Sequence, residues 1–208
     1  MLRLILVRHG ETSWNEERRM QGGFSDIGLN ERGKQQAACL GRALKNEEIV
    51  AIYASPLSRA LDTAQAIADR HQVQVRVDDD LREIDAGDVD GLSLDELGVK
   101  YSDFWQEWRR GTGTFRMPGG ESLGELQDRA WRAIERIRQG TPQGTVVVVA
   151  HTFIVLSIIC RALGLDLANI RRLRQDVGGF SILDFGQRGA SLVALNDTCH
   201  LGQEGVRQ

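Results

Sequence analysis

The chain alternates between short apolar runs and segments whose apolar residues recur at helical spacing. Three of the apolar runs are unbroken and rich in branched side chains, which is typical of strands buried on both faces of a sheet. These runs lie at residues 2–7, 49–54 and 145–150, and a weaker strand-like run lies at 73–77. Together they predict the core of a mostly parallel sheet.

Amphipathic stripes separate these runs and predict the helices that cover the sheet. The stripes occupy residues 37–44, 57–68 and 123–137, and a further helix is expected from residue 152 to about Leu163, before Gly164. Near the C-terminus, two runs at 179–185 and 191–196 predict a hairpin that adds an antiparallel strand. The alternation indicates an α/β fold, a three-layer α/β/α sandwich with a mostly parallel central sheet.

Residues 85–120 depart from this pattern, with several glycines, scattered aromatic residues and weak periodicity. We expect an excursion of loops and short helices that caps one end of the sheet, where substrate sites are commonly lined. Its aromatic residues are expected to form the core of a cap helix rather than a binding platform: Tyr101, Phe104, Trp105 and Trp108. We find no repeat or linker, so a single domain over residues 1–208 is predicted.

Composition narrows the class of function. The formal net charge of the 208 residues is −3, which disfavours nucleic acid as a partner. The apolar runs are too short to span a bilayer, and the N-terminus lacks the pattern of a signal peptide, so no membrane association is expected. Three widely spaced cysteines, Cys39, Cys160 and Cys199, fit a reducing cytoplasm and indicate neither a disulfide framework nor a zinc site.

Histidine and arginine follow the predicted strands. Arg8 and His9 follow the first, Arg59 lies in the helix that follows the second, and His151 follows the 145–150 strand. Ligands of open parallel sheets bind at the carboxyl ends of the strands, so these side chains are expected to converge. Two guanidinium groups and one imidazole could bind phosphoryl oxygens, leaving the second imidazole as the nucleophile.

An acid is needed to protonate a leaving alkoxide. Glu83 is the first candidate because it follows the strand-like run at 73–77, and Asp85 is the second. The alternative is that Glu83 is a solvated residue of an acidic stretch. Ser55 is expected to be a helix N-cap before Pro56 rather than a nucleophile. Arg109 and Arg110 fit equally well a solvated helix end or an anion contact.

These residues fall within segments that resemble the histidine phosphatase superfamily, also called the phosphoglycerate mutase-like family. The resemblance covers nearly the whole chain. The leading motif is Leu6-Val7-Arg8-His9-Gly10-Glu11-Thr12. The supporting segments are Trp14-Asn15, Leu29-Asn30-Glu31-Arg32-Gly33, Ser55-Pro56-Leu57-Ser58-Arg59-Ala60, Thr63-Ala64, Leu81-Arg82-Glu83-Ile84, Gly119-Gly120-Glu121-Ser122, Val149-Ala150-His151 and Asn196-Asp197-Thr198.

The resemblance implies a role for each matching residue. His9 is the phosphorylated histidine, and Glu83 exchanges protons with the leaving group and the attacking water. Phosphoryl oxygens are bound by Arg8, Arg59 and His151, and the loop beside the phosphate carries Asn15, Gln21 and Gly22. The family needs no metal, and no cofactor is expected. One departure is Thr152, which stands where the family commonly has Gly; its side chain could narrow the pocket or bind phosphate.

Two activities share the first half-reaction. A phosphatase admits water to the phosphohistidine, whereas a 2,3-bisphosphoglycerate-dependent mutase excludes it and holds a second anion. The segment from Ile84 to Leu92 resembles broad-specificity and α-ribazole phosphatases, and its aspartates disfavour a second phosphate. Against this, Trp108-Arg109-Arg110 resembles a mutase segment. The phosphatase is favoured. The expected substrate is a small phosphomonoester, with phosphoserine, phosphoglycerate, a sugar phosphate, α-ribazole phosphate and a nucleotide as the alternatives. A homodimer is one alternative for the assembly.

Overall fold

Six strands form one sheet in the order β3-β2-β4-β1-β5-β6. The computed structural model describes residues 1–111, 113 and 115–202. The four strands β1, β2, β3 and β4 run parallel, and β5 and β6 are antiparallel additions at one edge. Their bounds are Leu2–Arg8, Ile49–Ala54, Val75–Val77, Gly144–Ala150, Phe180–Gly186 and Gly189–Asp197 for β1 to β6. The predicted sheet is confirmed, although β3 is shorter than the run at 73–77.

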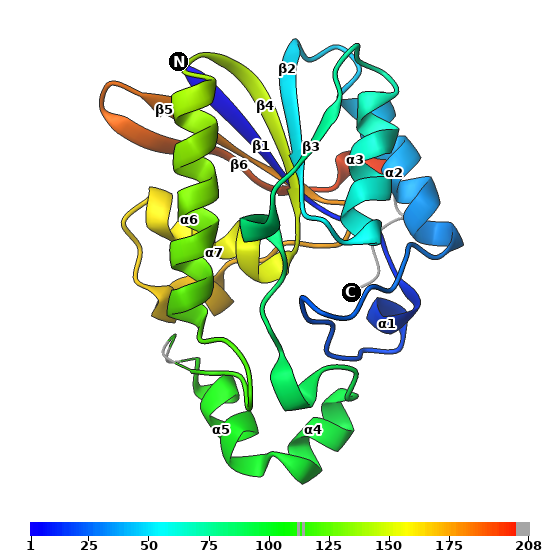
Figure 1. The fold of residues 1–208 in the computed structure, drawn as a ribbon, viewed down its shortest axis with the longest axis vertical. Coiled ribbons are helices and arrows are strands. Elements are labelled where there is room, and N and C mark those ends of the chain that lie inside the picture. The colour runs from blue at the N-terminus through cyan, green and yellow to red at the C-terminus, as the bar shows by residue number, and fades with distance from the viewer. Residues whose placement is uncertain (112, 114, 203–208) are drawn as a thin grey trace.

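Two pairs of helices cover the two faces of the sheet (Figure 1). Helices α2 (Glu31–Ala43) and α3 (Ser58–Ala68) pack on the face that carries Ile5 and Val7. Helices α6 (Leu123–Gly140) and α7 (Thr152–Ala162) pack on the other face. The alternation of β1 side chains between the two cores follows from the two-residue period of a strand. The three-layer sandwich is therefore confirmed.

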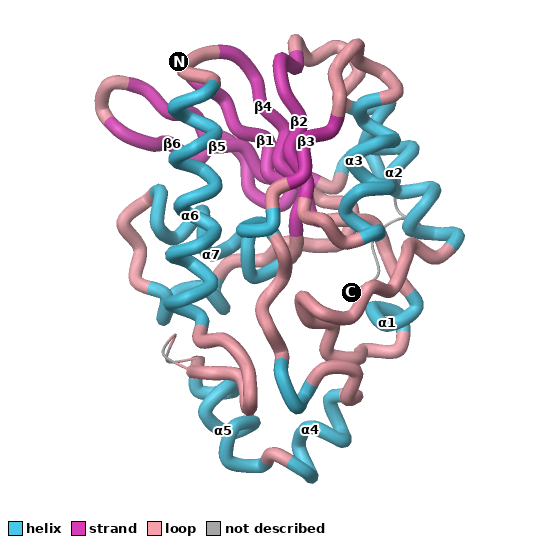
Figure 2. The backbone as a smooth tube through the Cα atoms, viewed as in Figure 1, coloured by secondary structure: helices cyan, strands magenta, loops and turns pink. Residues whose placement is uncertain are grey.

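The cap excursion lies beyond the carboxyl ends of the parallel strands (Figure 2). It contains α4 (Leu94–Lys100) and α5 (Ser102–Arg110), and the short α1 (Ser13–Glu16) lies at the same end of the sheet. The four predicted aromatic residues are partly buried and pack against the core that lies between the sheet and helices α6 and α7. Residues 112 and 114 of the excursion, and residues 203–208 of the predicted domain, lie outside the described residues. No helix in the described chain has the length and apolar character to cross a bilayer.

The polypeptide enters α3 differently from our expectation. The helix begins at Ser58 with Leu57 at the N-cap, and Leu57 makes no side-chain capping hydrogen bond. The prediction that Ser55 caps this helix is therefore wrong. Its hydroxyl lies 2.8 Å from Nε2 of His151 instead. A serine three residues before the helix is too far upstream to act as its N-cap, and the structure uses it to fix an imidazole.

Candidate active site

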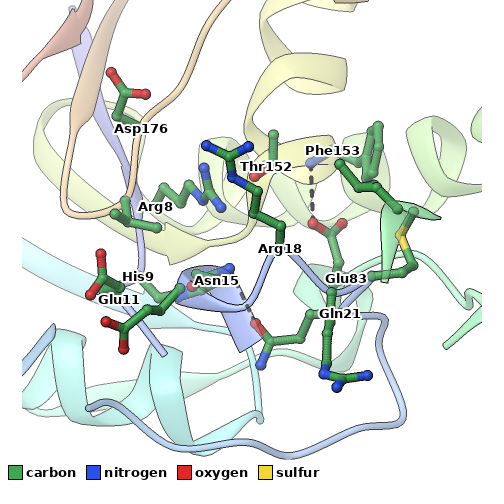
Figure 3. Close-up of a pocket in the computed structure, with 15 residues that line it drawn as sticks. Arg8, His9, Glu11, Asn15, Arg18, Gln21, Glu83, Thr152, Phe153 and Asp176 are labelled. Carbon is green, nitrogen blue, oxygen red and sulfur yellow. Dashed lines mark hydrogen bonds between the residues drawn. The ribbon is translucent and has the colours of Figure 1, made fainter. Parts of the chain in front are cut away.

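A cavity of about 480 Å³ opens at the carboxyl ends of β1 and β4. Six of the nine residues predicted from the sequence line it (Figure 3): Arg8, His9, Asn15, Gln21, Glu83 and Thr152. The other three, Arg59, His151 and Gly22, are not among its lining residues. The register of β1 and β4 explains why Arg8, His9 and His151 lie close together. Arg8 is paired with Ala150, and His151 directly follows Ala150.

His9 is held in one orientation and one tautomer. Its Nδ1 lies 2.7 Å from the carbonyl oxygen of Gly10. A carbonyl oxygen only accepts, so Nδ1 carries the proton and Nε2 retains its lone pair. Burial, together with the positive charges of Arg59 and Arg8, holds the pKa of His9 well below its usual 6.5. The imidazole is therefore neutral near pH 7, the state that a nucleophile requires.

Two arginines supply positive charge around this imidazole. Nη1 of Arg8 donates to the carbonyl oxygen of Gln175 at 2.8 Å. Arg59 is fully buried, and its two terminal nitrogens donate to the carbonyl oxygens of Ser25 and Gly22. Burial lowers the pKa of Arg59 to about 10, which leaves it charged at neutral pH. Nε of each arginine has no partner among the described residues, so each keeps a donor for an anion.

His151 lies beside His9, with 5.0 Å between the ring centroids. It occupies the N-cap position of α7, where unpaired N–H groups favour anions. Its Nε2 contacts the hydroxyl of Ser55, while its buried Nδ1 has no partner among the described atoms. Burial and the nearby cations lower the pKa of His151 well below 6.5. A buried, unpartnered nitrogen next to the nucleophile is suited to contact a phosphoryl oxygen.

Glu83 is a buried carboxyl group on the cavity wall, 5% exposed. Its two oxygens accept hydrogen bonds from the backbone N–H groups of Ile84 (2.9 Å) and Phe153 (3.2 Å). Burial raises the pKa of Glu83 and outweighs these hydrogen bonds and the nearby Arg59 and Arg129. The group is thus suited to give and take a proton. Asp85, the second candidate, does not line this cavity and bonds the N–H of Gly87.

The loop after β1 is organised by side-chain amides. Asn15 accepts hydrogen bonds from the backbone and hydroxyl of Thr12 in a capping box at α1. Oε1 of Gln21 lies 3.1 Å from the same hydroxyl, whose one hydrogen is shared between the two amide oxygens, and the buried Nε2 of Gln21 has no partner among the described residues. The N–H of Gly22 donates to Asp90 at 2.8 Å, and an added Cβ there would meet the Cβ of Ala86 at 2.7 Å. Gly22 therefore serves close packing behind the site.

Several lining residues were missed by the sequence reasoning. Arg18, Asp176 and Val177 line the cavity. Gln175 holds Arg8 through a main-chain oxygen, which no side-chain pattern could reveal. Arg18 lies in a charged run that reads as a solvated surface; its one signal was proximity to the Arg8-His9 motif. The described residues contain no group of three or more His, Cys, Asp or Glu that could hold a metal ion.

Comparisons with known proteins show which family this chain resembles in sequence and fold. The family model of the histidine phosphatase superfamily (branch 1) matches residues 4–198. Phosphoserine phosphatase 1 of Hydrogenobacter thermophilus is 37% identical over 203 residues, covering 98% of this chain and 96% of that protein. Phosphoglycerate mutase-like protein 4 of Arabidopsis thaliana is 35% identical, with coverage of 99% and 89%. The α-ribazole phosphatase structure from Shigella flexneri has a TM-score of 0.85 at 27% identity, with coverage of 94% and 96%.

Proposed function

Because this chain is a phosphomonoesterase of the histidine phosphatase superfamily, we propose that it hydrolyses small phosphomonoesters through a phosphohistidine at His9. The observation that carries this proposal is the contact between Nδ1 of His9 and the Gly10 carbonyl, 2.7 Å long. It aims an unprotonated Nε2 away from the backbone in a site that holds two arginines and a second histidine. Phosphoryl transfer depends mainly on such placement and charge complementarity.

The substrate phosphate binds between Arg8, Arg59 and His151. Each offers a nitrogen that has no partner among the described residues: Nε of the two arginines and Nδ1 of the histidine. These donors match the three non-bridging oxygens of a phosphoryl group. Of these three residues only Arg8 lines the cavity, and Thr152 lines it too, at the first position of α7, so its hydroxyl is a fourth candidate donor. The proposed reaction needs no metal ion or cofactor, because these groups balance the charge.

Glu83 transfers the protons. In the first step the Nε2 lone pair forms a bond to phosphorus, the bond to the leaving oxygen breaks, and protonated Glu83 gives its proton to that oxygen. In the second step the Glu83 carboxylate takes a proton from water as the water oxygen bonds to phosphorus. The phosphorus–nitrogen bond breaks and its electron pair returns to Nε2. The raised pKa of Glu83 suits a group that alternates between these roles.

Hydrolysis is favoured over the mutase reaction because Arg109 and Arg110, the two arginines at the end of α5, lie away from the cavity. Arg109 and Arg110 are exposed at the end of α5 and are not among the residues that line the cavity. Trp108, from the same segment, packs on Phe115 and Phe153. A mutase needs a second anion site that holds its bisphosphorylated cofactor, and this segment does not provide one at the cavity.

A panel of phosphomonoesters tests the proposal, with released phosphate measured for the wild type and His9→Ala. It includes 3-phosphoglycerate with and without 2,3-bisphosphoglycerate. We expect phosphate release by the wild type, none by His9→Ala, and an acid-labile phosphoenzyme after rapid quenching of the wild type only. Isomerisation that requires 2,3-bisphosphoglycerate and releases no phosphate would show that the chain is a mutase instead.

A further inference from the structure

Arg18 occupies an unusual backbone position at the edge of the cavity. It directly follows Glu17, the C-cap of α1, and has φ = 54°, in the left-handed region. Glycine is the usual residue at this position of a helix end, because any other side chain costs free energy there. The turn is fixed by backbone hydrogen bonds from Arg18 to Asn15 and from Arg19 to Trp14. The folded structure therefore tolerates the backbone strain of a left-handed arginine at position 18.

The side chain of Arg18 is directed at the cavity and is not used to hold the fold. In Figure 3 it extends from its loop toward Arg8 and Thr152. It forms no hydrogen bond or ion pair with any residue that the structure describes, and it lines the cavity. Its neighbour Arg19 differs, because Arg19 donates to the carbonyl oxygen of Gly91 and pairs with Glu17. Arg18 is thus available to a ligand.

We propose that Arg18 binds a carboxylate on the leaving group, so that the preferred substrates are small phosphorylated carboxylic acids; this rests on the proposed function. In-line attack by His9 expels the leaving group on the side of Glu83. Arg18 lines the same cavity as Glu83, together with Met20, Leu94 and Phe153. A guanidinium fork pairs with a carboxylate through two parallel hydrogen bonds.

The charge and size of the cavity favour a single carboxylate over a second phosphate. The cavity is lined by Arg8, Arg18 and Arg19, but Glu11, Glu16 and Asp176 line it as well and offset much of this positive charge, which disfavours a second dianion more than a monoanion. A volume of about 480 Å³ suits a small metabolite. Arg18 is therefore a specificity-determining residue: it selects the leaving group and takes no part in the transfer of phosphate.

The test compares substrates that differ in the carboxylate. The pairs are 3-phosphoglycerate with glycerol 3-phosphate, and phosphoserine with phosphoethanolamine. For Arg18→Met and Arg18→Gly we expect kcat/KM to fall about 10- to 100-fold for each carboxylate substrate, mainly through KM, the range of a charge-assisted hydrogen bond. The partner substrates should change less than about 3-fold. Arg18→Gly should keep or raise the unfolding temperature, because glycine tolerates the left-handed region.

The matched control is Arg188→Met. Arg188 is an exposed arginine in the turn between β5 and β6, which lies at the amino end of β1 and so at the opposite end of the sheet. Arg188→Met should leave kcat/KM unchanged for both substrates of each pair. Equal losses for the two members of a pair, or no loss in either Arg18 variant, would overturn the inference while leaving the proposed function intact. Failure of the wild type to release phosphate from any substrate would overturn both.

Discussion

The strongest test of how the acid is positioned is Arg129→Met. Arg129 lies on α6, and its guanidinium donates to the backbone carbonyl oxygens of Asp80, Arg82 and Glu83. The same group forms two hydrogen bonds with the carboxylate of Glu121, at 2.7 and 2.9 Å. One side chain therefore clamps the segment that carries Glu83. Arg129 itself is not among the residues that line the cavity, so it acts through position.

The size of the effect follows from burial. The side chains of Arg129 and Glu121 are each only 15% exposed, so removing the cation leaves a carboxylate and three carbonyl groups poorly solvated. Breaking a buried ion pair from one side costs about 3–5 kcal/mol, and residual exposure places this pair near 3 kcal/mol. For a chain of this length, that corresponds to an unfolding temperature lower by roughly 6–12 °C. We expect kcat to fall about 10-fold, most for poor leaving groups.

Arg132→Met is the matched control, one turn further along α6. Arg132 pairs with Asp80 at 3.3 Å but is 58% exposed, so its loss should cost less than about 1 kcal/mol. Thermal unfolding and kcat for phenyl phosphates of graded leaving-group pKa would be measured for both variants. If Arg129→Met were as stable and active as Arg132→Met, the clamp would have no energetic role. A loss of stability with unchanged kcat at every leaving group would refute the positioning of Glu83.

Three further results are expected. Glu83→Gln should slow turnover most for poor leaving groups and remove the fall of kcat/KM at high pH, because the acid is active only below the raised pKa of Glu83; equal slowing for all leaving groups would exclude it as the acid. Burial raises the folded-state pKa of Glu83 above its ordinary 4.5, so the folded state is favoured while Glu83 is protonated, and this stability is present below pH 4.5 and lost as the pH rises through the folded-state pKa. Glu83→Gln should therefore raise the unfolding temperature more at pH 8 than at pH 5, and an equal rise at the two pH values would contradict this. Ser55→Ala should cost about 1 kcal/mol and weaken inhibition by inorganic phosphate, as His151 loses its only side-chain hydrogen bond in the described structure; unchanged inhibition would mean that Ser55 does not orient the ring.

Much of the fold could be predicted because its strands and helices have strong local patterns. The runs at 2–7 and 145–150 are apolar on both faces, and the structure buries both strands between two helical layers. The stripe at 123–137 lies within α6, whose N-cap Ser122 forms a capping box with Glu125. The convergence of His9 and His151 followed from a rule about strand ends, which holds whatever the details of the loops.

The contacts that orient the site were beyond prediction, because they are long-range and involve groups without a sequence pattern. Arg8 is held by a carbonyl oxygen of Gln175, and every residue has such an oxygen. Ser55 reads as a local cap and is used across the sheet. Gly22 reads as a phosphate-loop residue, yet its N–H is bonded to Asp90 in the cap excursion. Such pairings depend on loop geometry that only the assembled structure defines.

The in-register pairing of β1 with β4 has a consequence during protein synthesis. β1 is synthesised first. β4, the neighbouring strand that brings His151 close to His9, begins only at Gly144. A nascent chain that lacks β4 therefore carries His9 without the strand whose Ala150 carbonyl accepts the His9 N–H. Closing so long a loop is slow compared with forming local helices. We expect ribosome-bound chains that end before β4 to be chemically inert, so that activity arises late and all at once during translation.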